Sequence, residues 1–172
     1  MDLNELKNRR LALISMMCSD SIAILSSADK NFRTKDVENP YRQHSDFLYM
    51  AGLTEPNLIC LLIKGNNEWK SILFRDNTSE HEKIWEGDRL DNKQISEKYD
   101  FPEIYNTSDC KDKISNYIKN KKVIYVEKGL NVVIDNLVLK ELEKSEKDSQ
   151  KEVAPLNLIT QKLRLIKSNY EI

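Results

Sequence analysis

The residues with the most obvious chemical potential lie between positions 39 and 57, in the stretch NPYRQHSDFLYMAGLTEPN. There His44, Ser45 and Asp46 follow one another directly. These are the residue types of a hydrolytic triad, but consecutive side chains diverge on a helix or a strand. A nucleophile, a base and an orienting acid must converge in space, which requires residues distant in sequence. The stretch is therefore not a triad, and we predict no catalytic residue in this chain.

Other site chemistries find little support in the remaining residues. The two histidines, His44 and His81, belong to no metal-binding motif, so no metal site is predicted. The four glycines lie too far apart to form a phosphate-binding loop. The 27 lysines and arginines nearly balance 28 aspartates and glutamates, which argues against nucleic-acid or anionic-membrane partners. No run of about 18 apolar residues is present, so no membrane span is expected.

Cysteine usage bears on the cellular compartment. Cys18, Cys60 and Cys110 are far apart, and each has apolar neighbours. An odd number without paired spacing predicts reduced, buried thiols in a reducing compartment. Because the N-terminus also lacks a signal-peptide pattern, the expected location is the cytoplasm.

Hydrophobic patterning predicts an α/β fold, with a mixed β-sheet and helices on both of its faces. Strands are predicted over residues 21–26, 58–63, 69–74 and 122–126. The second and third of these form a hairpin. Helices are predicted over residues 3–17, 78–85, 92–99, 110–120 and 130–142. The polar residues 28–40 are predicted to form a loop.

Local rules assign structural tasks to the polar residues of the 39–57 stretch. Arg42 and Asp46 lie four residues apart and can pair if the backbone is helical there. Gln43 and Ser45 can bond to backbone groups of the loop.

The second half of the same stretch is apolar and ends in a turn. Phe47 and Tyr49 alternate with Leu48, a pattern that suggests a strand entering the core. Gly52 suits a turn that needs a positive φ. The residues alone thus predict an ordered, partly buried segment and name no function.

A resemblance to a known family adds to this interpretation. The stretch resembles the signature of the N-terminal domain of aminopeptidase P, within the creatinase/prolidase family of metallopeptidases. The matching residues are Tyr41-Arg42-Gln43, Ser45-Asp46-Phe47, Tyr49, Gly52 and Glu55-Pro56. EKIWEGDRL at 82–90 resembles the family's Ile-Trp-x-Gly-x-Arg-Leu segment, and LRLIKSNYEI at 163–172 resembles the lead into the catalytic domain.

The resemblance implies a creatinase/prolidase N-terminal fold, which is ribonuclease H-like, over residues 1–160. Residues 161–172 would begin a linker into a catalytic domain. In such enzymes that second domain holds two metal ions, usually manganese, on two Asp, one His and two Glu, and cleaves the bond preceding proline. None of those ligands maps onto these 172 residues, so we expect no cofactor in this chain and no activity from it alone.

The resemblance also implies partners. Such an N-terminal domain contributes to oligomer assembly and walls the active-site cleft, often that of a neighbouring subunit. The expected partners are therefore its own catalytic domain, neighbouring subunits and peptides with proline at position two.

Site roles follow from the same resemblance. Trp85 is assigned to substrate access, because the Trp of this motif in relatives can lie at the substrate-site entrance; a core or interface tryptophan explains it equally well. Arg89 is a second access candidate, and a structural ion pair explains Arg89 and Arg42 as well. Arg42, Asp46, Tyr49 and Gly52 are expected to be structural.

One alternative to the peptidase domain remains open: a stand-alone protein-binding module derived from the same family. The linker-like end KLRLIKSNYEI counts against it. A prolidase is disfavoured by the RQ-x-SDF and IW-x-G-x-RL segments together.

Overall fold

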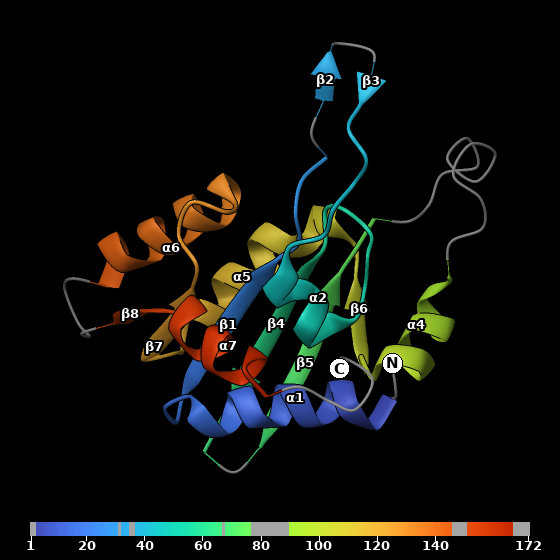
Figure 1. Ribbon diagram of the computed structural model, residues 1–172. Coiled ribbons are helices and arrows are strands. Elements are labelled where there is room, and N and C mark those ends of the chain that lie inside the picture. Colours follow the sequence, from blue (N-terminus) through green and yellow to red (C-terminus); the bar gives the residue numbers. More distant parts are fainter. Residues whose placement is uncertain are drawn as a thin grey trace.

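The computed structural model describes residues 3–30, 32–34, 37–66, 68–76, 90–145 and 151–166. A six-stranded mixed sheet forms the centre of this part of the chain, with strand order β6-β5-β4-β1-β7-β8 (Figure 1). β1 pairs antiparallel with β4, and β4 pairs antiparallel with β5, whereas the outer pairs β5–β6, β1–β7 and β7–β8 are parallel. The strands are β1 (Ser21–Ser26), β4 (Ile59–Lys64), β5 (Trp69–Phe74), β6 (Glu103–Tyr105), β7 (Val123–Val126) and β8 (Glu152–Pro155).

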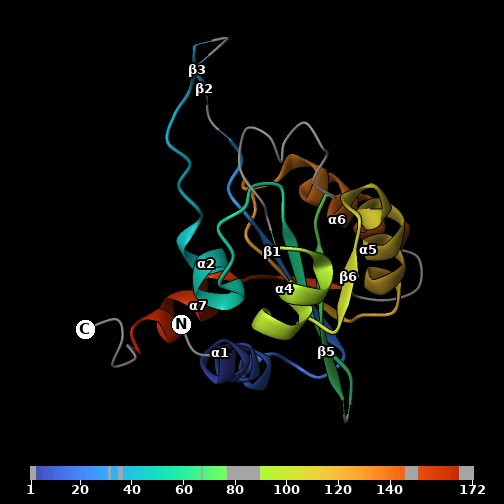
Figure 2. The same cartoon turned by 90° about the vertical axis from the view of Figure 1, so that its right-hand side faces the viewer.

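Helices cover both faces of the sheet, which confirms the predicted fold class. Figure 2 shows α5 and α6 on one side and α1, α2 and α7 on the other. The first layer consists of α1 (Leu3–Met16), α2 (Ser45–Ala51), α4 (Asn92–Tyr99) and α7 (Asn157–Arg164). The second consists of α5 (Cys110–Lys119), which follows a short 3-10 helix at Thr107–Asp109, and α6 (Val132–Ser145).

β1 shows why the sheet must be covered twice. All six of its residues are buried. Ala23 and Leu25 belong to the core cluster beneath α1 and α2, while Ile22 and Ile24 belong to the cluster beneath α5 and α6. Because side chains alternate across a strand, a continuous apolar run such as this one needs a protein layer on each face.

Several short elements differ from the sequence prediction. Residues 28–40 were expected to be a loop, but β2 (Phe32–Thr34) and β3 (Val37–Glu38) pair antiparallel within them. This ribbon extends away from the main sheet in both views (Figures 1 and 2). β6, β8 and α7 were not predicted either. The two strands are three and four residues long and only partly buried, so neither carries a strong alternation signal.

One prediction in the signature stretch is wrong. Residues Ser45–Ala51 form the helix α2, not a strand entering the core. A seven-residue helix spans only two turns, so the apolar positions Phe47, Tyr49 and Met50 fit a strand pattern and a helix pattern alike. The other predicted helices and strands within the described residues are confirmed to within a few residues. The helix predicted over 78–85 lies outside the described residues.

The prediction that all the thiols are buried is wrong for one of them. Cys60 and Cys110 are buried, but Cys18, in the turn between α1 and β1, is exposed. Burial raises the pKa of the Cys60 thiol to about 12, and it also raises the pKa of Cys110. Both buried thiols therefore stay protonated and unreactive near neutral pH.

We expect one of the three cysteines to react with Ellman's reagent in the native protein, because only Cys18 is exposed. All three should react after unfolding in guanidinium. A Cys18→Ser variant should lose the native reaction, and a Cys110→Ser variant should keep it. Rapid native labelling of Cys18→Ser would show that this account of the core is wrong.

Among the helices of the described residues, none is both long enough and apolar enough to cross a membrane.

Candidate functional site

Gln43 connects the signature stretch, residues 39–57, to the segment that follows β1. The buried amide oxygen of Gln43 accepts hydrogen bonds from the backbone N–H groups of Ala28 and His44, each at 2.8 Å. Its amide nitrogen donates to the carbonyls of Leu53 and Glu55, at 3.2 and 2.9 Å. One side chain thus ties together three backbone segments, which confirms the structural role predicted for it.

Asp46, in the first turn of α2, is buried and points at α7. Its carboxylate accepts hydrogen bonds from the Thr160 hydroxyl and from Nη1 of Arg164, the latter at 2.6 Å. The condition for a pairing with Arg42 is not met, because α2 begins only at Ser45. Arg42 is exposed, and the arginine that pairs with Asp46 is 118 residues away in sequence. No rule based on local spacing could have identified that partner.

Tyr49 continues the same connection one turn later. Its hydroxyl donates to the Leu163 carbonyl at 2.9 Å, and the Ile166 carbonyl lies 3.3 Å away. The Arg9 guanidinium lies 3.9 Å above the Tyr49 ring and donates to its backbone carbonyl at 3.2 Å. Tyr49 therefore joins α2 to both α1 and α7. We call Asp46, Tyr49, Thr160 and Arg164 the α7 anchor.

Gly52 ends α2 in the left-handed conformation, with φ of 73°, and its N–H donates to the Leu48 carbonyl at 2.9 Å. This confirms the predicted positive φ. A Cβ atom at this position would lie 2.7 Å from Cδ1 of Leu6, a buried side chain of α1. The position therefore needs glycine both for its backbone conformation and for the close approach of α1.

We expect Gly52→Ala to lower the free energy of unfolding by about 1–3 kcal/mol, through backbone strain and the contact with Leu6. Gly129→Ala is the matched control, because Gly129 also has a positive φ, 89°, but nothing lies within 4 Å of an added Cβ. Urea unfolding of both variants measures the difference. Equal losses would show that Leu6 does not require the glycine.

A second cluster connects the signature to the segment that carries Trp85 and Arg89. Arg75 is almost fully buried, and its guanidinium donates to Glu55 Oε2 at 2.9 Å. It also donates to the Leu90 carbonyl at 2.7 Å and to Oδ1 of Asn92 at 3.1 Å. We call these four residues the Arg75 cluster. It brings the chain at residue 75 and the chain at residue 90 together beside the signature turn.

The sequence prediction did not identify Arg75. A lone arginine after a strand is usually a surface residue, so the sequence carried no signal for its burial. Trp85 and Arg89 themselves lie outside the described residues.

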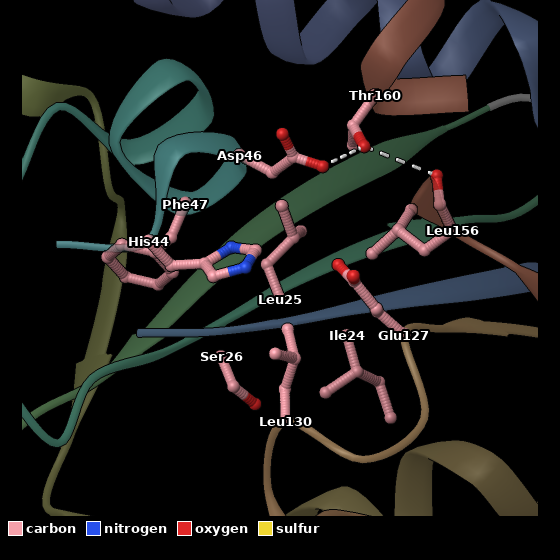
Figure 3. A pocket seen from close by; sticks show the side chains of 10 residues that line it. All are labelled: Ile24, Leu25, Ser26, His44, Asp46, Phe47, Glu127, Leu130, Leu156 and Thr160. Atoms are coloured by element: carbon pink, nitrogen blue, oxygen red, sulfur yellow. Dashed lines mark hydrogen bonds between the residues drawn. The ribbon is translucent and has the colours of Figure 1, made fainter. Parts of the chain in front are cut away.

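A small pocket opens beside α2 at the carboxyl ends of β1 and β7 (Figure 3). Its volume is about 10 Å³, room for about one water molecule. Its lining residues are Ile24, Leu25, Ser26, His44, Asp46, Phe47, Glu127, Leu130, Leu156 and Thr160. Both carboxylate oxygens of Asp46 are already used, one by Thr160 and the other by Arg164. The Asp46 carboxylate therefore has a structural role, because both of its oxygens bond to α7.

The resemblance assigns the two-metal centre to a catalytic domain that would follow these residues. Such a centre needs several carboxylate and imidazole ligands at fixed separations. Within the described ranges, no group of three or more His, Cys, Asp or Glu side chains could hold a metal ion.

One further group of titratable residues lies at the β5–β6 edge, on strands and α5. Lys70 donates to Glu103 Oε1 at 3.1 Å and to the Tyr117 hydroxyl at 3.3 Å, and the Tyr105 hydroxyl donates to Glu103 Oε2 at 2.9 Å. Burial acts to raise the pKa of Glu103, but the hydrogen bonds from Tyr105 and Lys70 outweigh it and hold the pKa below its usual range. Lys70 and Glu103 are both partly exposed, so this is a surface ion-pair network.

Comparisons with known proteins agree with the signature. Residues 6–125 match the family model of the aminopeptidase P N-terminal domain. The Xaa-Pro aminopeptidase of Escherichia coli is 34% identical over 98% of this chain and 40% of its own length. The low-pH structure of aminopeptidase P from E. coli matches with a TM-score of 0.88 and 28% identity over 98% of this chain and 40% of its own. Proline aminopeptidase P II from Yersinia pestis matches with a TM-score of 0.88 and 30% identity, over 99% of this chain and 41% of its own.

This chain spans about 40% of the length of these relatives. The matching region contains the signature stretch, the mixed sheet and the helices on both faces of the sheet. The family model alone covers well over half of the 172 residues, and the fold agrees throughout the described part. The chain belongs to the family of aminopeptidase P N-terminal domains.

Proposed function

We propose that these residues are the non-catalytic N-terminal domain of an Xaa-Pro aminopeptidase, a metallopeptidase that releases the residue preceding proline. One observation carries the proposal. The buried polar side chains of the signature bond within the domain, to α7 and to the Arg75 cluster, and none of them is arranged as a reaction centre. In this proposal the signature is a structural framework, and the chemistry is done by another domain.

The α7 anchor would set the direction in which the chain continues into a catalytic domain. α7 is the last helix of the described residues, and its C-terminal half is held by Asp46 and Tyr49. In this proposal, two metal ions, usually manganese in such enzymes, belong to that following domain. The proposed location is the cytoplasm.

The Arg75 cluster would serve the second task, peptide access. It fixes the chain on both sides of the interval that contains Trp85 and Arg89. In the proposed enzyme, Trp85 and Arg89 help to wall the active-site cleft, and the domain contributes to oligomer assembly with neighbouring subunits. The substrates would be peptides with proline at position two.

The test is substrate kinetics of the full-length protein carrying Trp85→Ala. Loss of an aromatic contact with substrate should raise KM for Xaa-Pro peptides by about fivefold, because stacking contributes on the order of 1 kcal/mol beyond area burial. Trp69→Ala is the control, because Trp69 lies in β5 and packs against the core. That variant should lower stability and leave KM unchanged. An unchanged KM for Trp85→Ala would remove the access role.

The stand-alone binding module remains the second candidate. It shares the fold and the framework, so the coding sequence after Ile172 distinguishes the two. A following domain with the Asp, Asp, His, Glu, Glu ligand set supports the peptidase. A stop codon there would mean that this chain shares only its ancestry with the peptidases.

A further inference from the structure

A second pocket lies at the end of the sheet opposite the signature, between the β4–β5 turn and the C-terminal half of α5. Because Lys64 pairs with Ser21, this turn lies beside the start of β1, at the other end of the sheet from the β2–β3 ribbon (Figures 1 and 2). The volume of the pocket is about 400 Å³, within the range of small-molecule sites. Its lining includes Ile63, Glu68, Lys70, Tyr117, Asn120 and Lys121. We call it the α5 pocket.

Two ammonium groups line the α5 pocket, and each is held in place by two acceptors. Lys70 donates to Glu103 Oε1 at 3.1 Å and to the Tyr117 hydroxyl at 3.3 Å. Lys121 donates to Asp20 Oδ1 at 3.1 Å and to a backbone carbonyl at the end of β4 at 3.3 Å. An ammonium group has three N–H donors, so each lysine keeps one for a ligand. Burial acts to lower the pKa of Lys70, but its hydrogen bonds to Glu103 and Tyr117 outweigh this and raise the pKa, so Lys70 is charged near neutral pH.

Two neutral groups add further donors to the same pocket. The Tyr117 hydroxyl accepts a hydrogen bond from Lys70, so its own hydrogen remains available to a ligand. Among the described residues, none bonds to the side-chain amide of Asn120, which carries two N–H donors. Glu68 supplies the one carboxylate of the lining, against the two lysines. The α5 pocket is therefore rich in hydrogen-bond donors and carries an excess of positive charge.

The last carbonyls of α5 do not cancel this positive charge. An anion near a helix C-terminus is ordinarily disfavoured by the helix dipole. Here Lys151 Nζ donates to the carbonyls of Ile118 and Lys119, at 2.8 and 3.0 Å, so a cation already offsets the dipole.

The rest of the lining that concerns a ligand is apolar or aromatic. Ile63 belongs to the core cluster beneath α5 and α6 and presents hydrocarbon to the pocket. The Lys70 ammonium lies 4.9 Å from the centre of the Tyr117 ring, so the ring and the charge are adjacent. An occupant that uses the whole pocket thus needs an anionic end and an apolar body.

We propose that the α5 pocket is a binding site for a small organic carboxylate with an apolar or aromatic body. The carboxylate accepts hydrogen bonds from Lys70 and Lys121, and the body packs on Ile63 and on the Tyr117 ring. A neutral ligand would form weaker hydrogen bonds with the same donors, and a cation would be repelled by the two ammonium groups.

This binding site goes beyond the proposed function and does not rest on it. The residues that line the α5 pocket lie outside the signature, the α7 anchor and the Arg75 cluster. Its test measures binding to this chain, so the result is independent of whether the full-length protein hydrolyses Xaa-Pro peptides.

Two-dimensional NMR of the isotope-labelled chain during titration with phenylacetate tests the proposal without mutation. The backbone amides of Gly65 and Lys70 and the side-chain amide of Asn120 should shift and reach saturation. Phenylacetamide has the same size but no charge, and it should bind about tenfold more weakly, because charge-assisted hydrogen bonds are roughly twice as strong as neutral ones.

The chain offers an internal reference for this titration. A pocket of about 360 Å³ at the ends of β7 and β8 has one lysine, Lys128, balanced by Glu127, and no aromatic residue in its lining. Its amides should not shift with phenylacetate. Equal shifts in both pockets, or equal affinity for phenylacetamide, would overturn the proposal. Equal affinity for inorganic phosphate would also overturn it, because the apolar part of the pocket would then contribute nothing.

A pair of double variants gives an independent measurement. Lys70→Met/Lys121→Met keeps most of each side chain and removes both ammonium groups. It should weaken phenylacetate binding by roughly 100-fold, because each charge-assisted hydrogen bond contributes about tenfold. Lys119→Met/Lys122→Met is the matched control, since these lysines are exposed at the same end of α5 and do not line the pocket. The control should change the affinity by less than about twofold. Equal losses in the two double variants would contradict the proposal.

Tyr117→Phe is a milder variant that keeps the ring and removes only the hydroxyl. It should weaken phenylacetate binding by about threefold, because one neutral donor is lost. The spectrum of each variant without ligand reports whether its fold is intact. Unchanged affinity in a folded Lys70→Met/Lys121→Met variant would show that the ammonium groups do not bind the carboxylate.

Discussion

Replacement of Arg10 by alanine is expected to lower the free energy of unfolding by about 3–5 kcal/mol. Arg10 is fully buried, and its guanidinium donates to the carbonyls of Met50, Tyr99 and Asp100 at 3.1, 2.7 and 3.2 Å. These carbonyls belong to the C-terminal ends of α2 and α4, where backbone acceptors have no partner within the helix. The same group lies 4.7 Å from the centre of the Phe101 ring. Alanine would remove this donor from the Met50 and Tyr99 carbonyls, leave the Asp100 carbonyl with only the Ser71 hydroxyl at 3.3 Å, and leave a cavity beside them.

Lys7→Ala is the control for the Arg10 variant. Lys7 lies on the same helix, is about half exposed, and reaches the Asp100 carboxylate only at 3.6 Å. An exposed ion pair of this kind contributes little, so the loss should stay within about 1 kcal/mol. Urea unfolding monitored by circular dichroism measures both variants. Similar losses would show that Arg10 does not join the helix ends in the way described.

Asp46→Ala should have the second-largest effect, a loss of about 2–4 kcal/mol in the free energy of unfolding. The substitution removes the acceptor for Arg164 and for the buried Thr160 hydroxyl, and hydrogen bonds to charged groups contribute more than neutral ones. The α7 anchor would then depend on Tyr49 alone. Amide exchange within α7 should therefore accelerate more than exchange within α6.

Two double-mutant cycles decide which arginine pairs with Asp46. The cycle of Asp46→Ala with Arg164→Ala should give a coupling energy of about 1–2 kcal/mol, because the two side chains share a hydrogen bond. The cycle with Arg42→Ala should give a value near zero, because Arg42 is exposed and Asp46 is bonded elsewhere. The reverse result would favour the pairing that local spacing predicted and would contradict the α7 anchor.

Features that depend on local patterning could be predicted from the sequence. The long apolar runs of β1 and β4, the periodic faces of α5 and α6, and the β4–β5 hairpin all appear where patterning places them. Gly52 and Gln43 also follow local rules, one through its positive φ and the other through side-chain bonds to the loop backbone. Such features need only the periodicity and chemistry of neighbouring residues.

Features that depend on contacts distant in sequence could not be predicted. The partners of Asp46 lie 114 and 118 residues away, and Arg10 bonds to carbonyls up to 90 residues away. A charged residue is expected at the surface, so the burial of Arg10 and Arg75 could not be predicted from their residue type. The sequence predicted a strand where α2 lies, because seven residues are too few to separate a helical from an alternating pattern. The edge strands β6 and β8 are short and half-exposed, and take their form from the strands beside them.

In the proposed function, these residues are the framework of a peptidase and not its reaction centre. The most direct test is to incubate the purified 172-residue chain with Mn²⁺ and an Xaa-Pro peptide, and to measure release of the N-terminal residue. We expect no release above the uncatalysed rate by this chain, and release by the full-length protein under the same conditions. Metal-dependent turnover by the 172-residue chain alone would contradict it.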